Sequence, residues 1–184
     1  MPTKNASLRS RYASEIRPAL MKQLGIENVM AAPKVTKITL NVGLGQAKTD
    51  QRVTEVAVKA LEKITGQKPV LTKAKKSIAG FKIREGMNVG AVVTLRGEKM
   101  FDFIERLVNL TLPKVRDFSG LSPKSFDKQG NYNLGFREHL VFPEIKADEA
   151  EKILGLQVTV STTANDREAG LALLQALGFP FSKK

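Results

Sequence analysis

The chain has 184 residues, of which 42% are hydrophobic and 26% charged, and these values are typical of one folded globular domain. Its formal net charge of +12 makes nucleic acid the first candidate partner and an anionic membrane surface the second. The absence of cysteine excludes disulfides and thiol catalysis, and a single histidine, His139, leaves little material for a catalytic triad or a metal site.

Residues 7–24 predict an N-terminal helix. Pro18 should kink this helix or divide it, and Gly25 should end it. Arg9 and Arg11 lie off the apolar stripe, so we expect them to face outward. The stripe repeats every four residues and consists of Leu8, Tyr12, Ile16, Leu20 and Leu24.

Residues 35–42 alternate strictly and predict a half-buried strand. Ile38, Leu40 and Val42 share the apolar face. The opposite face carries hydrogen-bonding groups and little charge, which suits the sugars, phosphates and base edges of RNA, although a merely solvated face is the alternative. The residues on this second face are Lys37, Thr39 and Asn41.

The segment from residue 68 to residue 99 holds eight Lys or Arg residues and two Glu, and therefore half of the net charge. Two strand-like ends, near Val70 and from Val89 to Leu95, enclose residues 74–88, which we call the basic loop. The basic loop contains few apolar residues, so we expect it to bury little surface and to be mobile in isolation. It is either a solvated hairpin loop or a nucleic-acid finger with cations for phosphates and an aromatic ring, Phe81, for stacking.

The remaining pattern predicts four further helices or helical pieces, a hairpin and one more strand. Thr49 or Asp50 is expected to cap a helix that runs to Thr65, and a second helix covers residues 98–112. Residues 113–145 are irregular, with a possible hairpin at 126–136 around Gln129-Gly130 and a short helix at 137–142. We expect His139, in this short helix, to be partly packed at the surface. A strand at 156–163 precedes a helix capped by Asn165.

This order predicts an α+β fold in one domain, residues 1–184, with a βαββαβ-like, antiparallel-dominated sheet. The helices pack on one face, the other face stays free, and the N-terminal helix and the long basic hairpin loop are additions. A free sheet face next to a basic loop favours RNA binding. Two alternatives remain open: an unspecific RNA chaperone, and a small enzyme acting on phosphorylated substrates, for which we find no catalytic constellation.

Several blocks of sequence resemble the bacterial form of ribosomal protein five of the large subunit. They occur in the same order as in that family and cover nearly the whole chain. The blocks are KITLNVGLG at 37–45, TGQKPVLTKAKKSIAGFKIREG at 65–86, VTLRGEKM at 93–100, VRDFSGL at 115–121, NYNLG at 131–135 and FPEI at 142–145.

The resemblance implies a structural, ribosome-bound cytoplasmic protein that is not an enzyme, needs no cofactor or metal, and has no membrane partner. Its implied partners are 5S rRNA in the central protuberance, other large-subunit rRNA, peptidyl-site tRNA, and a protein of the small-subunit head, contacted by residues 115–145 across an intersubunit bridge. The implied 5S rRNA-binding residues are Lys37, Thr39, Asn41, Gln67 and Thr94, to which the N-terminal helix adds Arg9 and Arg11. The implied tRNA-contacting residues of the basic loop are Lys73, Lys75, Lys76, Ser77, Phe81, Lys82 and Arg84.

Overall fold

The computed structural model describes residues 7–45, 51–145 and 152–182. The chain divides into two compact units. The first unit comprises Met1–Ile38, Leu95–Asn133 and Thr159–Lys184. The second unit comprises Thr39–Thr94 and Leu134–Val158. No helix in the described part of the chain is long and apolar enough to cross a membrane.

Five strands form a sheet in the order β2-β3-β1-β5-β4, and the predicted α+β class is confirmed. The predicted strands at 35–42 and 156–163 are observed within one residue of their expected ends. The hairpin expected at 126–136 is observed, with an antiparallel bridge between Phe126 and Tyr132, but its second strand, β4, was not expected to join the sheet. The strands are β1 (Val35–Gly43), β2 (Val70–Lys73), β3 (Asn88–Leu95), β4 (Tyr132–Phe136) and β5 (Leu156–Thr162).

The second unit has a core between helix α3 (Gln51–Thr65) and one face of its strands. Val53, Ala57, Leu61 and Ile64 of α3 are at most 1% exposed, so the amphipathic stripe predicted for this helix is buried. The strand residues of this core, all at most 4% exposed, are Leu40, Val42, Ala91 and Val93. The predicted caps Thr49 and Asp50 lie outside the described residues.

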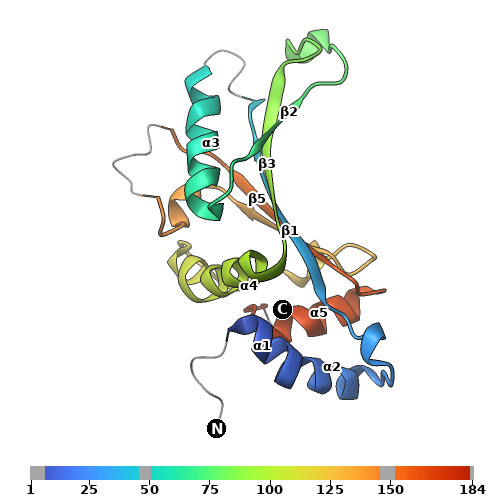
Figure 1. Cartoon of the computed structure of the whole chain (residues 1–184). Helices are drawn as coiled ribbons and strands as arrows, with labels where there is room; N and C mark the ends of the chain where they lie inside the picture. The colour runs from blue at the N-terminus through green and yellow to red at the C-terminus, as the bar shows by residue number, and fades with distance from the viewer. Residues whose placement is uncertain (1–6, 46–50, 146–151, 183–184) are drawn as a thin grey trace. The chain divides into compact units, whose positions relative to one another are not determined.

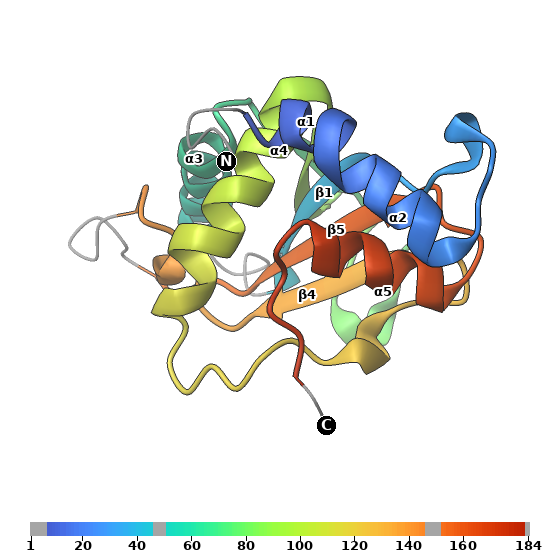
Figure 2. The same cartoon turned by 90° about the horizontal axis from the view of Figure 1, so that it is seen from below.

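The first unit contains the N-terminal helix, which consists of α1 (Leu8–Arg11), a π-helical turn at Tyr12–Ile16 and α2 (Arg17–Leu24). The wide turn directly precedes Pro18, which lies in the first turn of α2 and has no N–H to donate. Gly25 ends the helix with a left-handed φ of 65°, as predicted. In the same unit α1 contacts α4 (Gly97–Arg106), and α2 lies beside α5 (Arg167–Ala176), as Figure 2 shows.

The helix predicted at 98–112 is confirmed: α4 continues without a break as a π-helical turn, Leu107–Thr111, and a short 3-10 turn, Leu112–Lys114, follows. The start of the last helix differs from the prediction. Helix α5 is capped by Asp166 and not by Asn165: the Asp166 carboxylate accepts a hydrogen bond of 2.8 Å from the Ala169 N–H. Both side chains can cap a helix, so composition alone did not distinguish them.

His139 is buried, with 2% of its surface exposed, and the expectation of a surface histidine was wrong. It lies in a 3-10 turn of the second unit, His139–Val141. Its backbone N–H donates to the Leu154 carbonyl at 3.0 Å, and its Nδ1 accepts from the Leu154 N–H at 3.2 Å. Burial lowers the pKa of the imidazole below its ordinary value of 6.5, because the charged form loses hydration there.

We therefore expect the single imidazole of the chain to titrate below pH 6.5 in the folded protein and near its ordinary pKa in urea. The unfolded chain takes up this proton first, so the contribution to folding stability is complete above about pH 6.5 and is lost as the pH falls through the lowered pKa. NMR titration of the histidine ring protons measures both values without a mutation. A folded-state midpoint at or above 6.5 would contradict the buried, neutral assignment.

Candidate nucleic-acid interface

The strands of the second unit turn one face away from its core, and we call this the open face. Thr39 and Asn41 alternate along β1 with buried neighbours, and Thr94 alternates in the same way along β3. Strand β2 pairs antiparallel with β3, so that Val70 is opposite Val92 and Thr72 is opposite Gly90. The open face consists of Thr39, Asn41, Val70, Thr72, Gly90, Val92 and Thr94.

The polar side chains of the open face have unused hydrogen-bonding capacity. Among the described residues, the side chains of Thr39, Asn41 and Thr94 have no hydrogen-bond partner, and the same holds for Gln67, which lies between α3 and β2. Their location on an accessible face lets these groups bond to water or to a ligand. A neutral face of this kind can read hydroxyls and base edges, whereas it offers no charge to a phosphate.

Polar residues of the strands in the first unit behave differently. The Thr36 hydroxyl donates to the Ser161 carbonyl at 3.0 Å, and the Thr159 hydroxyl donates to the Asn133 carboxamide oxygen at 2.7 Å. Both hydroxyls are satisfied within the protein, one by a backbone carbonyl and one by a side chain. The open face thus differs from these strand positions, whose polar side chains are bonded within the protein.

The basic loop is a hairpin extension at the far end of β2 and β3 (Figure 1). Ala74 donates to the Met87 carbonyl at 2.8 Å, and Gly86 donates to the Ala74 carbonyl at 3.0 Å. Nearer the tip, Ile78 and Ile83 exchange two backbone hydrogen bonds of 2.9 and 3.1 Å. These bonds give the loop a defined backbone although residues 75–82 are all exposed, which confirms that it buries little surface.

The tip of the basic loop presents cations around an exposed ring. Phe81 is 66% exposed and ends a short 3-10 turn, Ala79–Phe81, and Lys82 follows with a left-handed φ of 52°. The Ser77 hydroxyl oxygen accepts from the Glu85 N–H at 2.9 Å, which ties the two arms together below the tip. Neither Lys73, which ends β2, nor any loop cation has an ion-pair partner in the described part of the chain; the loop cations are Lys75, Lys76, Lys82 and Arg84.

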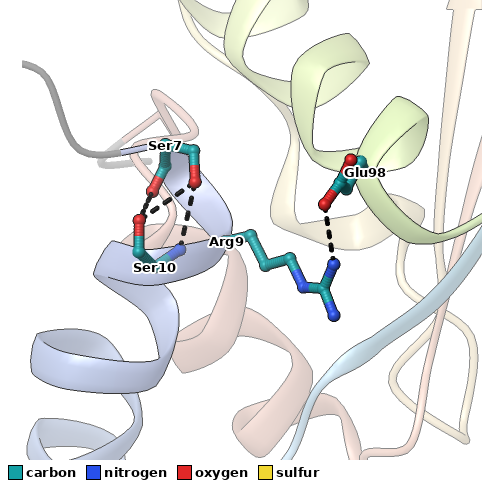
Figure 3. A network of polar contacts seen from close by, with 4 residues as sticks. All are labelled: Ser7, Arg9, Ser10 and Glu98. Carbon is teal, nitrogen blue, oxygen red and sulfur yellow. Dashed lines mark hydrogen bonds and ion pairs between the residues drawn. The ribbon is translucent and has the colours of Figure 1, made fainter.

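The candidate residues of the first unit are Arg9, Arg11 and Lys37. The Ser7 hydroxyl caps α1 through the Ser10 N–H at 3.4 Å, so the helix begins just before Arg9 (Figure 3). Arg9 Nη1 donates to Glu98 Oε1 of α4 at 3.1 Å, while Arg11 and Lys37 have no ion-pair partner among the described residues. Arg9 therefore already has a carboxylate partner, although its side chain is 60% exposed.

The structure groups the predicted residues into separate sets. Thr39, Asn41 and Thr94 share the open face, the loop residues gather around the hairpin tip, and Arg9 and Arg11 lie on the N-terminal helix. Sequence reasoning missed Thr72 and Gly90, because their place on the open face depends on the β2–β3 register. Within the described residues, no group of three or more His, Cys, Asp or Glu side chains could hold a metal ion.

Comparison with known proteins relates both parts of the chain to one family. Residues 28–84 match the family described as ribosomal protein L5, and residues 88–181 match the model of the C-terminus of the same ribosomal family. The chain is 56% identical over 176 residues to the large ribosomal subunit protein uL5 of Anaeromyxobacter sp., covering 96% of this chain and 98% of that protein. It is 55% identical over 179 residues to uL5 of Syntrophotalea carbinolica, covering 97% of each.

We expect Glu98→Gln to release Arg9 from its ion pair. Because both partners are largely exposed, the free energy of unfolding should change by less than about 1 kcal/mol. If Arg9 contacts an RNA phosphate, the freed guanidinium should tighten RNA binding roughly two- to five-fold at low salt and have little effect at high salt.

Glu105→Gln is the matched control, since it removes the same charge from the exposed end of α4, where the described residues provide no ion partner. Binding titrations at two salt concentrations compare the variants. An equal gain in RNA affinity from Glu98→Gln and Glu105→Gln would mean that the gain comes from net charge alone and that Arg9 does not contact the RNA.

Proposed function

Because the chain belongs to the ribosomal protein L5 family, a structural and non-enzymatic component of the large ribosomal subunit, we propose that it binds 5S rRNA and attaches it in the central protuberance. Membership makes the protein a ribosome-bound constituent of the cytoplasmic large subunit, and rRNA its general partner. The proposal concerns which RNA is bound and which residues bind it.

The observation that supports this proposal is the unpaired polar set of the second unit. Thr39, Asn41, Gln67 and Thr94 keep their full side-chain hydrogen-bonding capacity within the described residues, whereas Thr36 and Thr159 are satisfied internally. A carboxamide or hydroxyl that already bonds within the protein gains little from a ligand, while an unpaired one on an accessible face can bond to an RNA edge. In the proposed complex these four residues fix the register of 5S rRNA.

Cations supply the attraction in the proposed complex. Arg11 and Lys37 have no carboxylate partner in the described part of the chain and are available to phosphates. Each phosphate that is neutralised releases counterions, so the logarithm of the binding constant should fall with the logarithm of salt concentration by about 0.7 to 0.9 per contact. The net charge of +12 also accelerates the first encounter with RNA.

The basic loop has a second role in the proposal. Its unpaired cations surround Phe81 at the end of a hairpin, which suits a flexible polyanion with accessible bases, and we assign this loop to peptidyl-site tRNA. The set comprises Lys73, Lys75, Lys76, Ser77, Phe81, Lys82 and Arg84. The segment from Val115 to Ile145 is assigned to an intersubunit bridge with a protein of the small-subunit head.

We expect Asn41→Ala to weaken 5S rRNA binding by about 1 to 3 kcal/mol, or roughly 5- to 150-fold in Kd, because it leaves RNA groups without their partner in a buried interface. Asn109→Ala is the control: it removes the same atoms from an exposed, unpaired asparagine of the first unit. Titration with labelled 5S rRNA measures both, after circular dichroism confirms folding. Unchanged affinity of folded Asn41→Ala would exclude Asn41 from the interface.

We expect simultaneous replacement of Lys75, Lys76, Lys82 and Arg84 by Ala to leave binding to isolated 5S rRNA almost unchanged. Binding of peptidyl-site tRNA to ribosomes carrying the variant should weaken, because four phosphate-directed charges are lost at one contact. The control removes four cations from the proposed bridge segment and the residue before it, Lys114, Arg116, Lys124 and Lys128, and should impair subunit association instead. A large loss of 5S rRNA binding by the loop variant would refute the division of roles.

A further inference from the structure

A bare Cα lies in the middle of the open face, at Gly90 of β3. Gly90 has no left-handed φ, so its backbone conformation does not require glycine. The limited space at this position favours glycine, because a Cβ would come within 2.8 Å of Thr72 Oγ1 and 3.3 Å of the Val42 carbonyl oxygen. It would also lie 3.6 Å from Asn41 Oδ1. The missing side chain therefore makes room for two polar side chains.

These two side chains approach Gly90 from opposite directions. Strand β3 lies between β2 and β1 in the sheet, and Thr72 is the cross-strand partner of Gly90. The Thr72 hydroxyl thus extends over β3 from β2, and the Asn41 carboxamide oxygen extends over it from β1. Among the described residues neither side chain has a hydrogen-bond partner.

The chemistry of this arrangement selects its ligand. Two oxygen atoms directed at one spot offer good partners to a hydrogen-bond donor, and no cation lies in the set to hold a phosphate, which only accepts. A ribose 2′-hydroxyl can donate to one oxygen and accept from the Thr72 hydroxyl at the same time. Such hydroxyls line the wide, shallow groove of A-form RNA, which a flat sheet face can approach.

We propose that Thr72, Asn41 and Gly90 form a single binding site for a ribose 2′-hydroxyl of the bound RNA. Thr72 and Asn41 hold the hydroxyl, and the buried Gly90 beneath them leaves the space that lets both side chains lie over β3. This inference rests on the proposed binding of 5S rRNA. It adds a residue, Thr72, whose contribution should be independent of salt, because no charge takes part.

Thr72→Val tests the site, since it replaces the hydroxyl by a methyl group of similar size. We expect 5S rRNA to bind this variant roughly 3- to 10-fold more weakly, with an unchanged slope of affinity against salt, and we expect Thr72→Ser to bind like the unaltered protein. The matched control is Thr54→Val on α3, which makes the same change away from the open face.

A double-mutant cycle decides whether the residues act on one group. Thr72→Val should cost little in an Asn41→Ala background, because the shared hydroxyl has already lost its site. As a single substitution, Gly90→Ala should weaken binding to 5S rRNA, because the added methyl group would displace the Thr72 hydroxyl. The assignment to one hydroxyl would be overturned if the losses in affinity from Thr72→Val and Asn41→Ala were fully additive. It would also be overturned if Thr72→Val reduced the slope of affinity against salt concentration.

The outcomes also separate this inference from the proposed function. If the unaltered protein does not bind 5S rRNA selectively, the proposed function fails. If it does bind, and Asn41→Ala weakens binding while Thr72→Val binds like the unaltered protein, only the Thr72 site is wrong. Circular dichroism and a thermal melt of each variant confirm that a loss of binding is not a loss of fold.

Discussion

Unused hydrogen-bonding capacity on one face of a sheet is the constraint on which this account depends. A β-strand presents alternate side chains to opposite faces, so the apolar set of β1 that fills the core fixes where Thr39 and Asn41 must lie. Their side chains find no partner among the described residues, whereas Thr159 and Asn133 pair with each other. These unpaired groups are available to water and, in the proposed complex, to an RNA edge.

Charge is arranged separately from this neutral face. The cations of the basic loop stand at the end of a hairpin, while Thr39, Asn41 and Thr94 carry no charge. Phosphate contacts position a nucleic acid without reading it, and contacts to base and sugar edges supply selectivity. In the proposed function the two sets serve different RNAs, peptidyl-site tRNA for the basic loop and 5S rRNA for the open face, so each can be altered without the other. Arg9 differs from both sets in that it already has an ion-pair partner, Glu98, within its own unit.

Periodicity predicted the elements that local sequence determines. The alternation of β1, the amphipathic stripe of α3 and the ends of the basic loop are all confirmed within one or two residues. The misses depend on contacts between distant residues. The place of strand β4 in the sheet depends on pairing with a distant strand. His139 is buried through its contacts with Leu154, and the approach of Thr72 to Gly90 follows from the register of β2 against β3. The pattern of residues along the chain does not indicate which distant residues pair in this way.

The most direct test of the central claim is the binding of the purified protein to 5S rRNA over a salt series, with tRNA and an unrelated hairpin RNA as competitors. The account predicts tight binding that survives both competitors, with a moderate salt slope, because neutral groups of the open face contribute alongside phosphate contacts. Weak binding that either competitor abolishes would contradict it. The positive charge would then act without selectivity, as in a general RNA chaperone.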